Sequence, residues 1–245
     1  LKSTPTPPLS RAPAGCLPRA RARPRASRPG CCRGHREAMA DAVGEEKYEE
    51  VARTGPLPEL VVFDLDACVW DPEMYQLRDP DGPFEFDGRR NVAVASSGEE
   101  VHLLGIAPAI FAELHSAPCW RSSRAAVASC CDAPDSARFL LGAFRTADDA
   151  CTLGDVLSWV EIHFGSKREH FRRIQKQSGI PFNRMLFFDD QSGNCREVGD
   201  LGVVTQRTPL GLTKEAWEEG LRRYAMSAGG VAEGARPARA SATRR

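Results

Sequence analysis

The 245-residue sequence lacks a continuous apolar run of the roughly 18 residues that a membrane-spanning helix requires. It also lacks a CxxC motif, and its nine cysteines are odd in number and include two adjacent pairs. This cysteine pattern is typical neither of a secreted disulfide framework nor of a zinc site. We therefore expect no membrane partner, and we expect reduced thiols in an intracellular, cytoplasmic protein.

The sequence has no net charge, with 33 Lys and Arg residues against 33 Asp and Glu residues, but the charges are unevenly distributed. Residues 1–38 carry +8 and residues 227–245 carry +3, which leaves −11 on residues 39–226. Nucleic-acid-binding proteins usually carry a basic surface. The acidic body therefore argues against nucleic acid as a partner, and its length suffices for one sizeable core.

The two basic ends have few of the aliphatic residues that build a core. Residues 1–38 consist mainly of Pro, Arg, Ala and Ser, so we expect disorder there. Two interpretations stay open: a translated leader before a start at Met39, or an organelle import signal, which the arginines favour and the prolines oppose. We expect residues 39–57 to be an N-terminal extension, residues 58–226 to be the folded domain and residues 227–245 to be a disordered tail.

Within residues 58–226, continuous apolar runs alternate with segments of helical periodicity. Continuous apolar runs predict buried parallel strands, because both faces of such strands are covered. The predicted strands are residues 60–65, 124–129, 185–189 and 202–205. The predicted helices are residues 107–116, 152–163, 167–178 and 214–226. This alternation predicts an α/β protein, a three-layer sandwich around a central parallel sheet.

Acidic and hydroxyl side chains stand where the predicted strands end. Asp64 and Asp66 follow the first apolar run, Ser129 ends another, and Asp189 and Asp190 end a third. The carboxyl ends of parallel strands meet at one edge of the sheet, where ligands bind. Each aspartate alone could cap a helix or end a turn, but several carboxylates together repel one another unless a cation lies among them. Ligands that offer only oxygen atoms predict Mg²⁺.

Lys167 opens the helix predicted at residues 167–178. The N-terminus of a helix disfavours a cation, so an acidic or phosphate neighbour explains this lysine better than a solvated position does. Beside a cluster of carboxylates, its charge suits a bound phosphate.

Four short motifs contain these residues: Phe63-Asp64-Leu65-Asp66, Ser129, Lys167 and Asp189-Asp190. Together they resemble the four motifs of the haloacid dehalogenase (HAD) superfamily. A closer resemblance to its eukaryotic magnesium-dependent phosphatases lies in Val69-Trp70, Gly165-Ser166-Lys167, His170-Phe171, residues 178–182, Phe187-Phe188 and Asn194. The resemblance covers about residues 58–224.

The resemblance implies a Rossmann-like, HAD-like fold and Mg²⁺-dependent hydrolysis of phosphomonoesters through an aspartyl-phosphate. Asp64 would be the nucleophile, and Asp66 would be the general acid and base. Ser129 and Lys167 would bind the phosphate of the substrate. The ligands of Mg²⁺ would be Asp64, the backbone carbonyl of Asp66 and Asp189, with Asp190 acting through water or supporting the ligands.

The spacing of the motifs bears on the substrate. Residues 71–100 are rich in Asp, Gly, Pro and Arg, and we expect them to form a loop or hairpin over a strand end. Neither the segment between Asp66 and Ser129 nor that between Ser129 and Lys167 is long enough for a large cap domain. The resemblance implies protein phosphotyrosine or a sugar or fructosamine phosphate as the substrate. An open site suits a phosphate on a bulky partner, such as a protein side chain or a glycated amine, and suits a small sugar phosphate less well. We expect a monomer or a weak dimer, and a dimer could close the site.

The sequence departs from the family pattern beside two motifs. Ala67 and Cys68 replace an aromatic residue and a threonine, and Cys130-Cys131 replace an Arg-Thr pair whose arginine Arg89, Arg90 or Arg121 could supply. An alternative function follows: a catalytically weak pseudo-enzyme that serves as a metal- or phosphate-binding partner module. A further hypothesis is that oxidation of Cys68 and Cys130 inhibits the enzyme, although small cysteines usually only pack.

Two other phosphate-handling folds fit less well. A cysteine-dependent phosphatase needs five residues between its cysteine and its arginine, whereas only four separate Cys119 from Arg124. A response-regulator receiver has its acidic pair on the first strand and its lysine on the last, and this sequence has the opposite order.

Overall fold

The computed structural model describes residues 55–234, with side chains described up to residue 227. Residues 1–38 and 235–245 and most of the predicted extension at 39–57 lie outside the described residues. The helices are α2 (Ala107–Ser116), α3 (Pro134–Ala143), α4 (Leu153–Val156), α5 (Lys167–Ser178), α6 (Ser192–Gly199) and α7 (Lys214–Gly234). None of the helices described has the combination of length and hydropathy that crossing a membrane requires.

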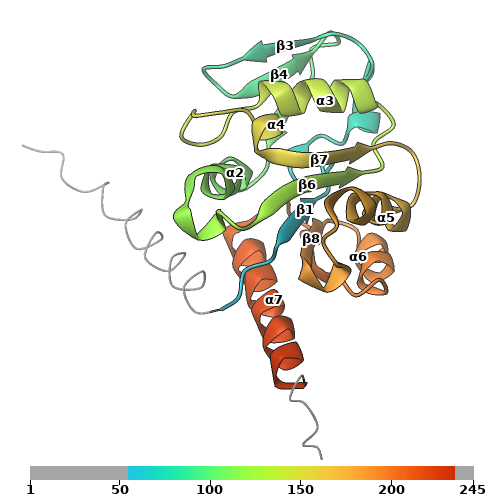
Figure 1. Cartoon of the computed structure of the whole chain (residues 1–245). Coiled ribbons are helices and arrows are strands. Elements are labelled where there is room, and N and C mark those ends of the chain that lie inside the picture. The colour runs from blue at the N-terminus through green and yellow to red at the C-terminus, as the bar shows by residue number, and fades with distance from the viewer. Residues whose placement is uncertain (1–54, 235–245) are drawn as a thin grey trace, which may run out of the picture. The chain divides into compact units, whose positions relative to one another are not determined.

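The larger sheet has five parallel strands in the order β7-β6-β1-β8-β9 (Figure 1). They are β1 (Leu60–Phe63), β6 (Arg124–Ser129), β7 (Leu157–Ile162), β8 (Met185–Asp189) and β9 (Val204–Arg207). The central strand β1 pairs with β6 on one side and β8 on the other, so that Phe63 lies level with both Val127 and Phe188. The carboxyl ends of these three strands therefore lie next to one another.

The apolar run of β1 serves both faces of the sheet. Leu60 and Val62 pack with residues of α5 and α6, whereas Val61 and Phe63 pack with residues of α2, α3 and α7. On the second face the Phe63 ring lies 5.0 Å from that of Phe111 in α2. The structure thus confirms the predicted three-layer arrangement with a central parallel sheet (Figure 1).

Four of the eight predicted elements have the predicted bounds, and three others differ only at their ends. The elements at 107–116, 124–129, 167–178 and 185–189 agree residue for residue. The first strand ends at Phe63, the last begins at Val204, and α7 continues to Gly234, past the predicted end at Met226. Helices α3 and α6 are further helices that the periodicity analysis did not predict.

The helix predicted at 152–163 is wrong. The Thr152 hydroxyl accepts a hydrogen bond from the backbone N–H of Asp155 and caps a single helical turn, α4, after which the chain forms strand β7. The spacing of Leu153, Val156 and Val160 imitates a helix. Pairing of β7 along β6 outweighs that local pattern, because a strand at this sheet edge completes the ladder of β6.

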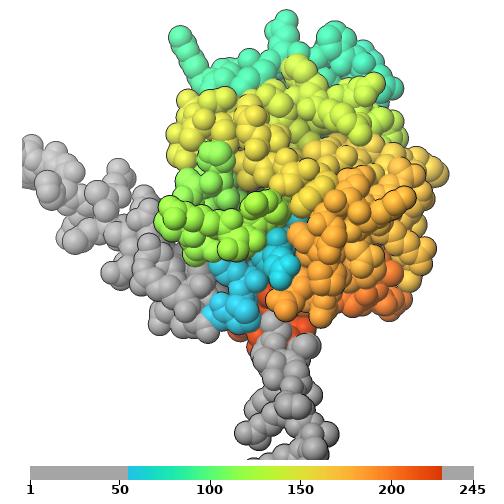
Figure 2. Space-filling model, viewed as in Figure 1, coloured from blue at the N-terminus to red at the C-terminus, as the bar shows by residue number. Residues whose placement is uncertain are grey.

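Residues 70–103 form a second, smaller sheet where a loop or hairpin was predicted. Its antiparallel strands, in the order β2-β5-β4-β3, are β2 (Trp70–Asp71), β5 (Glu100–Leu103), β4 (Val92–Ala95) and β3 (Phe84–Asp87). Phe84 of β3 stacks on Phe139 of α3, with ring centroids 6.2 Å apart. Figure 2 shows this sheet in teal at one end of the described body. Its strands of two to four residues form no large cap domain.

Gly220 on α7 sets how closely this helix approaches the sheet. A Cβ atom at Gly220 would lie 2.6 Å from Cζ of Phe188 on β8. We expect Gly220→Ala to lower the free energy of unfolding by about 1–3 kcal/mol through overpacking, although alanine favours helices. The change is measured by urea denaturation.

The matched control is Gly142→Ala in α3, where an added Cβ meets no atom within 4 Å. Here helix propensity decides, and stability should rise by up to about 1 kcal/mol. Equal effects of the two substitutions would contradict the close packing of α7 on Phe188.

Candidate active site

The strand order brings together residues that are distant in the sequence. Asp64 directly follows β1, Ser129 ends β6 and Asp189 ends β8, and these strands are neighbours. The backbone N–H of Asp64 donates to the carbonyl of Phe188 at 2.9 Å and so extends the β1–β8 ladder to the end of β8. Asp64, Ser129 and Asp189 are buried residues, at 6%, 1% and 0% exposure. The polar side chains that the sequence places at the carboxyl ends of the strands therefore lie together in one cluster.

Lys167 lies in the middle of this cluster, with 1% of its surface exposed. Its Nζ atom lies 2.5 Å from Oδ1 of Asp64 and 3.1 Å from Oδ2 of Asp189, and it donates to the carbonyl of Ala128 at 2.7 Å. Burial alone would lower the pKa of Lys167, but the charges of Asp64 and Asp189 outweigh burial and raise that pKa above its ordinary value. A buried ammonium with these three partners is charged at neutral pH.

Several hydrogen bonds fix the loop before α5 and so position Lys167. Ser166 caps the helix by accepting the backbone N–H of Glu169 at 3.2 Å. The ring nitrogens of the buried His170 lie 2.8 Å and 3.0 Å from the carbonyl oxygens of Ser166 and His163. The Cys130 thiol donates to the carbonyl of Gly165 at 3.1 Å. Side chains thus hold the backbone on both sides of the turn that leads into Lys167.

The carboxylates of Asp64, Asp189 and Asp190 form the group best suited to a metal ion among the described residues, with one oxygen of each within 4.8 Å of the others. Burial, followed by the charge of Asp64, raises the pKa of Asp189 to about 7 and that of Asp190 to about 6. The buried Oδ1 atom of Asp190 has no hydrogen-bond partner among the residues that the structure describes. Crowded carboxylates and an unsatisfied oxygen both fit a divalent cation with oxygen ligands, such as Mg²⁺.

Neighbouring groups orient Asp189 within this cluster. The amide of Asn194 donates to both of its carboxylate oxygens at 3.1 Å, and the backbone N–H of Gln191 donates to Oδ1 at 2.8 Å. The Arg207 side chain donates to the carbonyl of Asp190 at 2.9 Å and holds the next residue. Such outer contacts fix the direction in which a ligand oxygen points.

Asp66 and Ser129 stand at the same edge. Asp66 is partly exposed, and the Trp70 indole donates to its Oδ1 atom at 2.7 Å. Burial raises the pKa of Asp66 to about 6, with the bond from Trp70 opposing the rise and the charge of Asp64 adding to it. The Ser129 oxygen accepts the backbone N–H of Cys131 at 3.2 Å, which leaves its hydroxyl hydrogen to donate elsewhere.

The cysteines beside the motifs are packed rather than activated. Cys68 is fully buried, donates to the carbonyl of Phe188 at 3.7 Å and accepts the Thr208 hydroxyl at 3.3 Å. Burial raises the pKa of Cys68 well above its ordinary value, and burial also raises the pKa of Cys130. Because the thiolate is the form that oxidants attack, the burial and raised pKa of Cys68 favour a packing role at that position, whereas Cys130 is partly exposed.

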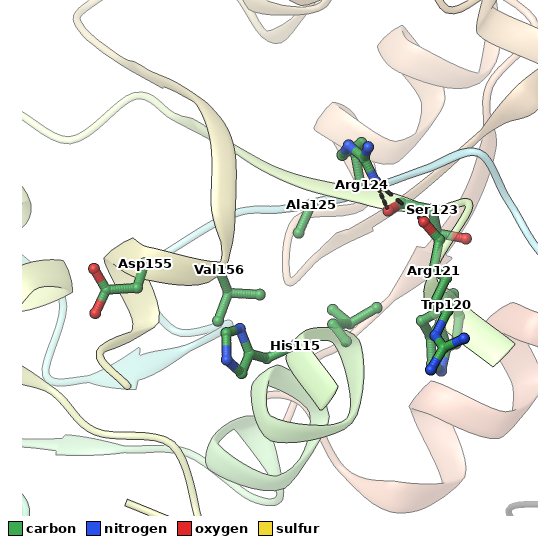
Figure 3. Close-up of a pocket in the computed structure, with 9 residues that line it drawn as sticks. His115, Trp120, Arg121, Ser123, Arg124, Ala125, Asp155 and Val156 are labelled. Carbon is green, nitrogen blue, oxygen red and sulfur yellow. Dashed lines mark hydrogen bonds between the residues drawn. The ribbon is translucent and has the colours of Figure 1, made fainter. Parts of the chain in front are cut away.

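A hollow of about 210 Å³ lies at the amino end of β6, away from the carboxyl ends of the strands (Figure 3). Its lining includes Arg121 and Arg124, whose side chains point to different sides in Figure 3. Arg124 donates to the backbone carbonyls of Arg121 and Ser123 at 3.3 Å and 3.0 Å. Arg121 precedes the start of β6, whereas Ser129 ends this strand, so Arg121 does not replace the arginine that the family pattern has after Ser129.

Sequence reasoning missed three contacts of this site: the Trp70 indole on Asp66, the Asn194 amide on Asp189 and the Ala128 carbonyl on Lys167. The first two residues occur in the motifs that carry the family resemblance. The third is a backbone group, for which side-chain identity provides no signal.

Comparison with known proteins agrees with this geometry. The model of a protein family described as Acid Phosphatase matches residues 56–227. The human protein "Magnesium-dependent phosphatase 1" is 30% identical over 172 residues, which are 69% of this chain and 88% of that protein. A HAD-like hydrolase superfamily protein of Schizosaccharomyces pombe is 32% identical over 150 residues, which are 60% of this chain and 83% of that protein.

Among solved structures, a HAD-superfamily hydrolase from Ehrlichia chaffeensis is similar with a TM-score of 0.46 and 13% identity, covering 69% of this chain and 98% of that chain. The N-terminal part of protein BF1531 from Bacteroides fragilis, containing a phosphatase domain complexed with Mg, has a TM-score of 0.43 and 20% identity. This second match covers 73% of this chain and 42% of that chain.

Proposed function

The chain belongs to the acid phosphatase family and is a magnesium-dependent phosphatase of the HAD superfamily, and we propose that it hydrolyses phosphomonoesters through an aspartyl-phosphate formed on Asp64. The observation that carries this proposal is the contact of one buried ammonium, Lys167, with Asp64 and Asp189 at the carboxyl edge of the sheet. Such an arrangement holds a carboxylate nucleophile beside a positive charge that can bind the phosphoryl group.

The proposed reaction has two steps, formation of the aspartyl-phosphate and its hydrolysis. An oxygen of Asp64 attacks phosphorus, and the bond from phosphorus to the leaving oxygen breaks while Asp66 gives that oxygen a proton. Asp66 then takes a proton from water, whose oxygen attacks phosphorus and breaks the bond to Asp64, releasing inorganic phosphate. Lys167 and the free hydroxyl hydrogen of Ser129 bind the phosphoryl oxygens, where charge spreads in the transition state.

The pKa of about 6 at Asp66 supports its part in both steps, because a carboxyl that titrates near neutral pH is readily protonated and deprotonated. Asp64, Asp189 and the backbone carbonyl of Asp66 would hold Mg²⁺, with Asp190 binding through water or supporting its neighbours. When bound, Mg²⁺ neutralises carboxylate charge and polarises a phosphoryl oxygen.

For the substrate, we propose protein phosphotyrosine or a sugar or fructosamine phosphate, with a phosphate on a bulky partner favoured over a small sugar phosphate. The small size of the second sheet supports this proposal, since its short strands build no large domain over the site. Comparing kcat/KM for phosphotyrosine peptides with kcat/KM for sugar and fructosamine phosphates separates the two classes.

The test of the reaction is hydrolysis of p-nitrophenyl phosphate by the full chain, with Mg²⁺ and after its removal by EDTA. We expect turnover with Mg²⁺, loss of turnover with EDTA and recovery when Mg²⁺ is restored. Calorimetric titration with Mg²⁺ is the second readout. Binding of Mg²⁺ by folded protein without turnover of any phosphate ester would contradict the proposal and favour the alternative of a metal-binding partner module.

A further inference from the structure

The carboxyl group of Asp66 is held by a residue that follows it closely in the chain. The Trp70 indole donates to its Oδ1 atom at 2.7 Å. Trp70 is fully buried, and its ring lies 6.2 Å from that of Phe144. The donor is therefore fixed in the protein interior, whereas the carboxyl that it contacts is partly exposed.

A tight turn returns Trp70 to Asp66. Ala67 has the left-handed φ of 56°, and its backbone N–H donates to the carbonyl of Trp70 at 2.9 Å. The backbone N–H of Trp70 in turn donates to the carbonyl of Leu65 at 3.2 Å. Trp70 also pairs with Leu103 as part of β2, which anchors the indole in the second sheet. The turn and the small sheet thus place one N–H group against one carboxylate oxygen.

We propose that Trp70 is a positioning residue for Asp66, in that its indole N–H holds the carboxyl in the one orientation that reaches both the leaving oxygen and the attacking water. The inference rests on the proposed function, since it assigns Trp70 a part in the proton transfers of that reaction. An indole N–H donates a hydrogen bond and accepts none, so it orients the carboxyl without competing for the transferred proton. A partly exposed carboxyl without this donor is free to turn toward solvent.

Substrates that differ in their leaving group test this role. An alkyl phosphate leaves as a strongly basic alkoxide and needs a proton from Asp66, whereas p-nitrophenolate leaves readily without one. Because general acid catalysis contributes ~10²–10⁴-fold, we expect Trp70→Phe to lower kcat/KM for an alkyl phosphate by ~10–100-fold. The loss for p-nitrophenyl phosphate should be several-fold smaller.

The chain provides a matched control in Trp120. This tryptophan is 1% exposed and donates its indole N–H to Oε1 of Glu113 at 2.8 Å, in a pair outside the site. Trp120→Phe removes the same group from a similar contact, so it should change kcat/KM for both substrates by the same factor. In an Asp66→Asn background, Trp70→Phe should add no further change in the ratio of the two substrates.

A second variant separates the hydrogen bond from packing. Benzothienylalanine at position 70 keeps the shape of the ring and replaces the indole N–H with sulfur, so the fold is retained even where phenylalanine leaves a cavity. We expect this variant to reproduce the loss that is selective for the alkyl phosphate. An unchanged ratio between the substrates would overturn the inference, whereas a parent protein without phosphatase activity would instead overturn the proposed function.

Discussion

Asp64→Asn is expected to abolish turnover of p-nitrophenyl phosphate, with a loss of about 10⁴-fold or more in kcat, as removal of a covalent nucleophile does. The amide has nearly the shape of the carboxylate but is a poor nucleophile toward phosphorus. Lys167 retains Asp189 at 3.1 Å as a charged partner, so the protein should still fold. The measurements are steady-state hydrolysis and rapid acid quenching, after which mass spectrometry detects a protein-bound phosphoryl group.

The matched control is Asp200→Asn, which makes the same change at an exposed aspartate paired with Arg168. Its activity should equal that of the parent. A phosphorylated protein should be trapped from the parent and from Asp200→Asn but not from Asp64→Asn. Turnover that survives in Asp64→Asn would show that Asp64 is not the nucleophile.

Lys167→Met is expected to impair both activity and stability. Methionine fills much of the same space but leaves Asp64 and Asp189, buried beside each other, without their shared cation. Loss of one member of a buried charge cluster costs about 3–5 kcal/mol. Loss of the charge that we propose binds the phosphoryl group should lower kcat/KM by ~10²–10³-fold. Urea denaturation at neutral pH and hydrolysis of p-nitrophenyl phosphate measure the two effects.

The effect of Lys167→Met on stability should depend on pH, because the pKa of Lys167 is raised. The charges of Asp64 and Asp189 outweigh burial and raise the pKa of Lys167 above its ordinary value, so its contribution to stability is complete at neutral pH. The contribution is lost only as the pH rises through the folded-state pKa, in the strongly alkaline range. The parent and Lys167→Met should therefore differ most at neutral pH and converge in strong alkali.

Lys176→Met in the last turn of the same helix is the control, because Lys176 is exposed to solvent. Substitutions at such positions usually change stability by less than about 0.5 kcal/mol. Equal stability of Lys167→Met and Lys176→Met would mean that the ammonium of Lys167 is not a structural partner of the two carboxylates.

The parts of the fold that the sequence predicted are those with a strong local pattern. The buried strands β6 and β8 read as continuous apolar runs, and Ser166 and Gly179 bracket α5 with recognisable helix ends. The site residues followed from the same logic, because parallel strands place their carboxyl ends together. Their positions agree with the prediction, while their chemical roles stay proposals.

The misassigned parts are those that depend on contacts distant in the sequence. Leu153, Val156 and Val160 have helical spacing, but pairing with β6 makes residues 157–162 a strand. Residues 71–100 were predicted to form a loop or hairpin because they are rich in Asp, Gly, Pro and Arg, and the strands of the second sheet, only two to four residues long, give little periodic signal. The hydrogen bond from Trp70 to Asp66 depends on a turn at Ala67, a residue type that rarely adopts a positive φ.

The position of Lys167 has a consequence for how the protein loses function. Its ammonium joins the end of β6, through the Ala128 carbonyl, to the residue after β1 and to the end of β8. These segments come from three separate parts of the chain and meet only when the middle of the sheet is complete. The proposed active site therefore forms only when α5 is packed on the assembled sheet. A chain whose α5 has come away from the sheet retains the four motifs but no longer brings them together.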